Sequence, residues 1–228
     1  HTVCIGAEPH SEEQRKRIEQ LLGVKAYNCF GMSEMNGPGV AFECTEQNGL
    51  HIWEDNVIVE IVDPVTLQPV PEGEVGELVL TTINREAMPL LRYRTRDLTC
   101  ILPGDCPCGR THKRLARFKG RSDDMIILKG VNLFPIQIEK ILMQFKELGS
   151  NYLITLETIG NSDEMLIEVE LSDLFTDDYS ALQRLTKGIT RQLKDELLLT
   201  PRIKLVAKGS LPTTDGKAVR VKDHRKLC

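Results

Sequence analysis

The segment from Gly49 to Thr82 constrains the fold more than any other part of the chain. It contains two stretches, "HIWEDNVIVEIVD" and "GELVLTT", that are rich in the β-branched residues typical of strands. The intervening "PVTLQPVPEGEVG" holds three prolines and two glycines, which predict turns and a loop. A further strand is expected in "LLRYRTRDLTCIL", and the compact loop "PGDCPCGRTH" follows it. The middle of the chain is therefore expected to be built mainly from strands.

A different pattern precedes this β region. Residues 2–6 form a short apolar run that predicts a strand, and "GAEP" breaks it. Ser11, followed by two glutamates, is a suitable N-cap for a helix that Gly23 should end. The apolar face of that helix should consist of Ile18, Leu21 and Leu22. Together these signals predict a strand-loop-helix unit of α/β type.

The character of the sequence changes again at Gly120. Polar turns separate two short strands in "GRSDDMIILKGVNLFP", and "PIQIEKILMQF" predicts a helix with proline in its first turn. Two strands, "YLITLETI" and "EMLIEVEL", precede the amphipathic helix "DYSALQRLTKGITRQLKDELL" and a last strand, "RIKLVAKG". This order suggests a small α+β layer of about 100 residues. We place the domain boundary within 120–124 and predict two domains, 1–119 and 120–228.

Charge and composition exclude several classes of protein. The 228 residues carry a net charge of -4 with both signs interspersed, so there is no basic footprint for nucleic acid and no polybasic patch for a membrane surface. No apolar run approaches the roughly 20 residues that span a bilayer. Seven cysteines, an odd number, favour a reducing cytosol over a secreted disulfide framework. The chain lacks an initiator methionine and opens on an apolar strand, so we expect a fragment of a longer protein.

Two polar clusters have residues that suit nucleotide binding. In "YNCFGMSEMNGPG", glycines allow close backbone approach to a ligand, while Ser33 and Glu34 could hold a phosphate oxygen and a divalent metal. In "YRTRD", Asp97 at the end of a strand could accept hydrogen bonds from ribose hydroxyls. Each cluster also has a purely structural interpretation. The first is then an ordinary Gly-rich loop, and the second is an ion pair of Asp97 with Arg94 or Arg96.

A third candidate lies in the stretch "LPTTDGKAVRV", which places Lys217 directly after a tight polar turn. A lysine ammonium is a compact cation suited to stabilising charge on a phosphate or carboxylate during group transfer. The alternative is a solvated surface lysine. The polar stretch "GRSDDMIILKG", at the domain boundary, is the fourth cluster that could carry chemistry.

The spacing of cysteine and histidine indicates a metal site. The stretch "CPCGRTH" contains two cysteines and His112, and "ECTEQNGLHIW" contains one cysteine and one histidine. Thiolate and imidazole ligands suit tetrahedral zinc. If the β segments bring these stretches together, a closed structural Zn²⁺ site is expected from Cys44, His51, Cys106 and Cys108, with His112 as the alternative fourth ligand. The other interpretation is free thiols beside an ordinary turn. No role is evident for the remaining cysteines, Cys4, Cys29, Cys100 and Cys228.

Taken in order, the clusters resemble the adenylate-forming superfamily of acyl-CoA synthetases, luciferases and peptide-synthetase adenylation domains. Within it the chain looks like the phenylacetate–coenzyme A ligase family, through "GAEP", "FGMSEMNGPGVAFEC", "GLHIWED", "LLRYRTRDLT" and "GRSDDMIILKGVNLFPIQIE". The resemblance extends over nearly the whole chain. Superfamily members usually have glycine where Arg96 stands, and the arginine is typical of the phenylacetate ligase branch. Their Ser/Thr/Gly-rich phosphate loop, expected upstream of "GAEP", does not occur in this chain.

The resemblance implies a fold and a reaction. The chain would be the end of a large AMP-binding N-terminal domain, with an α/β unit and a β-barrel-like subdomain, followed by a small mobile α+β C-terminal domain. A carboxylate would attack the α-phosphate of ATP in the presence of Mg²⁺, and coenzyme A would then displace AMP from the acyl-adenylate. The small domain would bring its lysine to the first step and then rotate, so that the loop at Lys129 and Gly130 lines the approach of the thiol.

The resemblance also implies roles for individual residues. Lys217 would bridge the phosphate and carboxylate oxygens during adenylation. On the adenine side the nucleotide would contact Ala7, Glu8 and Pro9, and at the base it would contact Asn28 and Phe30, with Gly31 beside them. Its α-phosphate would contact Ser33, and Glu34 would bind it through Mg²⁺. Its ribose would contact Asp97, and Arg121 would contact it near the hinge residue Asp123.

Because the phosphate loop and much of the acid pocket belong to the absent N-terminal portion, we expect little or no ligase activity from this chain alone. Two other functions stay open. One is a zinc-stabilised binding module without chemistry. The other is a relative that activates a different aromatic acid, such as an indoleacetate or benzoate analogue, or that passes the acid to a carrier protein. The sequence also leaves the oligomeric state open, including a homodimer.

Overall fold

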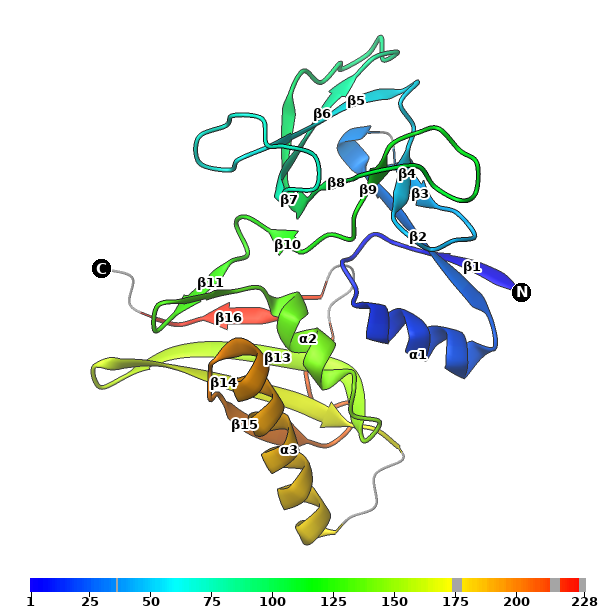
Figure 1. Ribbon diagram of the computed structural model, residues 1–228. Helices are drawn as coiled ribbons and strands as arrows, with labels where there is room; N and C mark the ends of the chain where they lie inside the picture. The colour runs from blue at the N-terminus through cyan, green and yellow to red at the C-terminus, as the bar shows by residue number, and fades with distance from the viewer. Residues whose placement is uncertain (36, 174–177, 214–217, 226–228) are drawn as a thin grey trace. The chain divides into compact units, whose positions relative to one another are not determined.

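The computed structural model describes residues 1–35, 37–173, 178–213 and 218–225 (Figure 1). By their contacts the residues form two compact units. The first comprises His1–Pro9 and Arg15–Asp124, and the second comprises His10–Gln14 and Met125–Cys228. The fold is mixed α/β, with several sheets and few helices, as predicted from the sequence. The assignment of 1–119 and 120–228 to an AMP-binding domain and a mobile lid stays a prediction.

The first unit contains a sheet of six short strands. These are β1 (Thr2–Ile5), β2 (Lys25–Met32), β3 (Gly37–Glu43), β4 (Leu50–Ile52), β8 (Ile101–Leu102) and β9 (Arg114–Leu115), with the 3-10 helix η1 (Ser33–Met35) between β2 and β3. They lie in the order β1-β2-β3-β4-β9-β8. β1 runs parallel to β2, and every other neighbouring pair is antiparallel. The order brings β9, which comes late in the chain, directly beside β4.

The helix α1 (Glu12–Leu22) begins and ends where the sequence predicts. Ser11 Oγ accepts a hydrogen bond from the backbone N–H of Gln14 at 3.2 Å, which is the expected N-cap interaction. Two glutamates in the first turn lie favourably at the positive end of the helix dipole. Gly23 has a φ of 62°, in the left-handed region where glycine is favoured, and the helix stops there.

Two of the three residues predicted for the apolar face of α1 are exposed, while Ile18 is half-buried. Leu21 and Leu22 are 73% and 66% exposed, and the buried residue of the helix is Arg15. Arg15 pairs with Glu19 at 3.1 Å, one turn along the helix. Glu19 also accepts a hydrogen bond from the backbone N–H of Ala26 at 2.9 Å. The helix is therefore attached to the start of β2 by a polar network instead of by leucine packing.

A second sheet in the first unit contains β5 (Val57–Val62), β6 (Gly76–Thr82), β7 (Tyr93–Thr99) and β10 (Gly120–Arg121), in the order β10-β7-β6-β5. All neighbours are antiparallel. The segment "LLRYRTRDLTCIL", predicted as one strand, is divided at Cys100 into β7 and β8, which belong to different sheets. The core of the unit includes the fully buried Val40, Ala41, Leu50, Ile52, Leu78, Leu80 and Leu115.

The second unit is an α+β layer. Its strands are β11 (Ile126–Leu128), β12 (Val131–Leu133), β13 (Leu148–Ile159), β14 (Ser162–Leu171), β15 (Arg202–Val206) and β16 (Val221–Asp223), and its helices are α2 (Pro135–Leu142) and α3 (Tyr179–Leu197). The first two strands form a hairpin, and the other four form a sheet in the order β15-β14-β13-β16. Figure 1 shows α2 and α3 over this sheet, and residues of both helices join its core. Asp178 caps α3 by accepting from the N–H of Ser180 at 2.9 Å.

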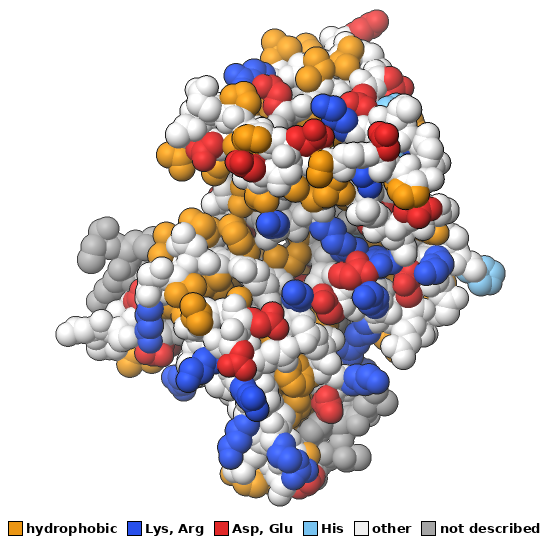
Figure 2. Space-filling model, viewed as in Figure 1, with side chains coloured by type: hydrophobic (Ala, Val, Ile, Leu, Met, Phe, Trp, Pro, Cys, Tyr) orange, Lys and Arg blue, Asp and Glu red, His pale blue; other side chains and the backbone are white. Residues whose placement is uncertain are grey.

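Charged side chains of both signs are mixed on the face of the molecule shown in Figure 2. This distribution matches the interspersed charges of the sequence. Among the described residues no helix is both long enough and apolar enough to cross a membrane.

Candidate functional site

The strand β2 carries the residues that the resemblance places at the adenine base. Asn28 is buried, and its backbone N–H donates a hydrogen bond to Glu43 Oε2 at 2.6 Å. The ring centroid of Phe30 lies 4.4 Å from that of Phe118 in a tilted arrangement. Gly31 follows directly. Because one side of Phe30 is already in contact with an aromatic ring, a base could stack only on the rest of its surface.

The end of β1 lies beside these residues. Ile5 pairs with Asn28 in the parallel register, so the chain leaves β1 at the level of the base motif. A Cβ on Gly6 would be 2.5 Å from the carbonyl oxygen of Cys29, which explains why only glycine fits there. Ala7 then adopts a φ of 69°. The segment predicted for the adenine side, Ala7, Glu8 and Pro9, therefore starts directly after a glycine that packs against β2.

Ser33 and Glu34 are both exposed in the helix η1. Arg85, from the loop after β6, donates a hydrogen bond through Nη1 to the carbonyl oxygen of Glu34. Arg85 also lines an open pocket of about 420 Å³ together with Met35 and Trp53. Arg85 was not predicted from the sequence, because its contact is to a backbone atom and leaves no side-chain pattern in the sequence. The Arg85 guanidinium therefore lies against the predicted phosphate and magnesium motif.

The strand β7 places Asp97 directly opposite Arg121 of β10. Arg121 Nη1 is 3.9 Å from Asp97 Oδ1, and the guanidinium forms two hydrogen bonds of 2.9 Å to the carboxylate of Asp123. The Arg121 guanidinium lowers the pKa of Asp123 through these bonds. Three of the predicted nucleotide and hinge residues are therefore gathered in one charged group of the first unit.

The two neighbouring arginines of β7, which are the alternative partners of Asp97, both approach Glu77. Arg94 forms a two-pronged ion pair with the fully buried Glu77, with hydrogen bonds of 2.8 Å and 2.7 Å. Arg96 Nη1 lies 3.8 Å from the same carboxylate. Arg96 also has a φ of 70°, a region that favours glycine, which accounts physically for the glycine usual at this position in the superfamily.

Lys217 lies outside the described residues. Gly130 lies in the turn between β11 and β12 of the second unit, with a φ of 81°. The neighbouring Lys129 also has a positive φ, 51°, and its Nζ is 2.9 Å from Glu164 Oε1. The loop predicted to line the approach of the thiol is thus a tight turn held by an ion pair to β14.

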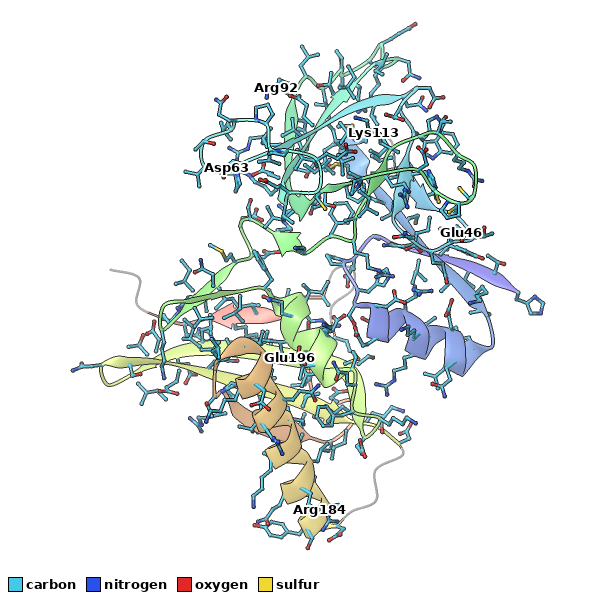
Figure 3. The ribbon with its side chains drawn as sticks, viewed as in Figure 1. Glu46, Asp63, Arg92, Lys113, Arg184 and Glu196 are labelled. Atoms are coloured by element: carbon cyan, nitrogen blue, oxygen red, sulfur yellow. The ribbon has the colours of Figure 1, made fainter. Side chains whose placement is uncertain are left out.

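Four side chains of the first unit converge, and we call them the Cys/His cluster: Cys44, His51, Cys106 and Cys108. Their ligand atoms all lie within 4.8 Å of one another. They come from the turn after β3, from β4 and from the loop between β8 and β9. Glu46 and Lys113, labelled in Figure 3, belong to the two connections that carry the cysteines. His112, the alternative fourth ligand, is outside the cluster, and its carbonyl oxygen faces His51 Nδ1 at 3.3 Å.

The surroundings of the Cys/His cluster shift the pKa values of its members in different directions. Burial raises the pKa of the Cys44 thiol to about 11. The backbone N–H of Arg110 lowers the pKa of Cys108 to about 7, because it donates to the sulfur. Burial also lowers the pKa of His51, which favours its neutral imidazole, the form that binds metals.

Comparison with known proteins connects both units to one family. Residues 1–84 match the family model described as AMP-binding enzyme, and residues 130–225 match the model described as AMP-binding enzyme C-terminal domain. The phenylacetate-coenzyme A ligase of Thermus thermophilus is 43% identical over 98% of this chain and 54% of its own length. That of Pseudomonas putida is 44% identical over 97% of this chain and 50% of its own length. The chain therefore spans about half the length of these relatives.

A solved structure gives the same result. A 2-hydroxyisobutyryl-CoA ligase in the postadenylation state, in complex with an acyl-AMP, matches with a TM-score of 0.87 and 30% identity, over 96% of this chain and 48% of the other. The chain belongs to the AMP-binding enzyme family, in its phenylacetate–coenzyme A ligase group, and represents the C-terminal portion of such an enzyme.

Proposed function

We propose that the protein to which this chain belongs activates an aryl-acetic acid, such as phenylacetate, with ATP and transfers it to coenzyme A. The observation that carries the proposal is the arrangement at β1 and β2. The parallel pairing of Ile5 with Asn28 supports one adenine-binding surface made from Ala7–Pro9 and the base motif. The identity of 40–44% to named phenylacetate–coenzyme A ligases supports the choice of reaction and substrate class.

In the first step a carboxylate oxygen of the acid attacks the α-phosphorus of ATP, and the bond to the β-phosphate oxygen breaks to release pyrophosphate. In the second step the sulfur of coenzyme A attacks the acyl carbon, AMP leaves with the bonding electrons, and the thiol proton goes to solvent. Both steps build negative charge on phosphate oxygens, so cations and N–H donors aimed at those oxygens are the expected catalytic groups.

The described residues fit roles in this scheme. Ser33 and Glu34 are exposed and free of burial constraints, so their oxygens can face a phosphate and a divalent ion. Mg²⁺ binds through one or two carboxylates together with substrate phosphates, which suits the Glu34 carboxylate. Asp97 would accept from the ribose hydroxyls, and Arg121 and Asp123 would hold the segment where the small domain begins to turn. Gly130 would line the path of the thiol.

Lys217 is proposed as the catalytic cation of the first step, on sequence resemblance alone. The test uses the complete enzyme and acid-dependent exchange of pyrophosphate into ATP. Lys217→Ala should lower this exchange by at least about 100-fold, the size expected for loss of one transition-state donor. Lys222→Ala is the control, because Lys222 is an exposed lysine of β16 and should leave exchange unchanged. Undiminished exchange after Lys217→Ala would refute the proposal.

The chain alone should show little or no exchange with phenylacetate, and robust exchange would contradict that expectation. A zinc-stabilised binding module without chemistry is the alternative, and calorimetry with AMP separates the two because such a module should not bind the nucleotide. A different aromatic acid is distinguished by comparing exchange rates with benzoate and indoleacetate. The odd number of cysteines supports a cytoplasmic location.

A further inference from the structure

The distances within the Cys/His cluster match those of a metal centre. For tetrahedral zinc, bonds of about 2.3 Å to sulfur and about 2.0 Å to nitrogen place two sulfurs about 3.8 Å apart, and a sulfur and a nitrogen about 3.5 Å apart. The Sγ atoms of Cys44 and Cys106 are 3.6 Å apart. Cys108 Sγ is 3.4 Å from His51 Nε2. Two independent edges of the cluster therefore have the lengths of the edges of one coordination tetrahedron.

The histidine of the cluster is oriented as a ligand. The carbonyl oxygen of His112 lies 3.3 Å from Nδ1 of His51 and can accept its proton. That hydrogen bond leaves Nε2, the atom that faces Cys108, with its lone pair available. A metal-binding histidine usually donates its other ring N–H to a carbonyl or carboxylate in this way. His51 is also 5% exposed, so water does not compete for the free nitrogen.

The surroundings balance the charge of such a centre. Three thiolates around one Zn²⁺ leave a net charge of -1. Arg110 contacts Cys108, and the buried Arg114 lies in the strand that pairs with His51. The guanidinium of Arg114 donates to the carbonyl of Asn48 at 2.9 Å and to that of Gly104 at 3.0 Å. These bonds join the two connections that supply the ligands, so the protein holds the loops together at the place where the metal would join them.

A disulfide explains less of this geometry. A bond between Cys44 and Cys106 would bring their sulfurs to about 2.05 Å and leave Cys108 and His51 without a reason to converge on the same point. Cys106 and Cys108 are separated by one residue, which makes a disulfide between them unfavourable. The four ligand atoms come from three segments of the chain and all lie within 4.8 Å of one another, which is the arrangement of a closed metal site.

We propose that Cys44, His51, Cys106 and Cys108 bind one Zn²⁺, and that this ion fastens the loop between β8 and β9 to the β3–β4 connection. All four positions are filled by protein, so the ion has no open position for chemistry and is structural. This inference is independent of the proposed ligase reaction, because it concerns metal content and stability and not catalysis.

The test measures zinc in the complete protein, purified under reducing conditions and washed with a weak chelator. The unchanged protein should retain about one zinc per chain. Cys44→Ser and Cys106→Ser should each retain less than about a tenth of that amount. Cys100→Ala is the matched control, because Cys100 is buried but outside the cluster, and it should retain the full amount.

Two further measurements apply even if a variant fails to fold. Cobalt loaded into the unchanged protein should show the intense visible absorption of a tetrahedral ion and a thiolate charge-transfer band. Removal of zinc with a strong chelator should lower the midpoint of thermal unfolding by about 5 °C or more. The proposal is overturned if the unchanged protein neither retains zinc nor binds cobalt tetrahedrally, if the cysteine variants keep their zinc, or if native mass spectrometry finds a Cys44–Cys106 disulfide in metal-free protein.

Discussion

Replacing Glu77 with alanine should lower the free energy of unfolding of the first unit by about 3 kcal/mol. Glu77 lies in β6 and its side chain is fully buried. Its carboxylate accepts two hydrogen bonds from Arg94, of 2.8 Å and 2.7 Å, and lies 3.8 Å from Arg96. Ser122 Oγ also approaches it, at 3.4 Å. One carboxylate thus joins β6, β7 and the segment that follows β10.

The magnitude follows from these contacts. A hydrogen bond to a charged group contributes about 1.5–3 kcal/mol net, so the two bonds from Arg94 contribute about 3–6 kcal/mol. The side chain of Arg94 is 30% exposed, and after the substitution its guanidinium can turn toward water instead of remaining buried and unpaired. We therefore expect a loss near the lower end of that range.

The measurement is urea unfolding followed by the fluorescence of Trp53, the single tryptophan of the chain, which lies in the same unit. Glu60→Ala is the control. Glu60 also pairs with an arginine, Arg92, at 3.1 Å, but both side chains are partly exposed, so this change should cost less than about 1 kcal/mol. Equal losses for Glu77→Ala and Glu60→Ala would refute the reasoning, since burial would then make no difference.

The pH dependence of this ion pair has a definite sign. Burial by itself would raise the pKa of Glu77, but the hydrogen bonds and charge of Arg94 outweigh it and the pKa is lowered. A carboxyl group with a lowered pKa contributes stability that is present above its unfolded value of about 4.5 and is lost as the pH falls through its folded value. The stability difference between the unchanged protein and Glu77→Gln should therefore shrink below about pH 4.5.

Two further outcomes are expected from other buried positions. Burial raises the pKa of Glu139, whose carboxyl group accepts a hydrogen bond from the hydroxyl of Tyr152 at 3.3 Å. The contribution of Glu139 to folding stability is therefore present at low pH and is lost as the pH rises through the raised pKa. Glu139→Gln, neutral throughout, should gain stability relative to the unchanged protein as the pH rises above about 4.5 in urea unfolding. Gly76→Ala should cost about 2 kcal/mol in the same assay, because the new Cβ would lie 2.4 Å from the carbonyl oxygen of Val62. Gly39→Ala, with no atom within 4 Å of its Cβ, should change stability by less than about 0.5 kcal/mol.

Short sequence patterns predicted the helices and strands that form from neighbouring residues. The proline at the start of "PIQIEKILMQF" predicted α2, and the β-branched stretches predicted β5 and β6. The strand β16 was missed, because its three residues carry no alternation that distinguishes them from a polar tail. It is a strand because it pairs with the buried Ile154 region of β13, and that partner is more than 60 positions away in the chain. Pairing across such a distance has no local signature.

The same distinction applies to the candidate sites. The ligand residues of the Cys/His cluster could be recognised in the sequence, because sulfur and imidazole side chains are rare and specific in what they bind. Their convergence depends on the sheet order β3-β4-β9, which no spacing between residues 44 and 106 could have specified. Gly49 shows what makes that order possible: a Cβ there would lie 2.9 Å from the carbonyl oxygen of Leu115 in β9. A glycine in the β3–β4 connection, unremarkable in the sequence, lets the backbones approach closely enough for ligands from distant segments to meet around one point.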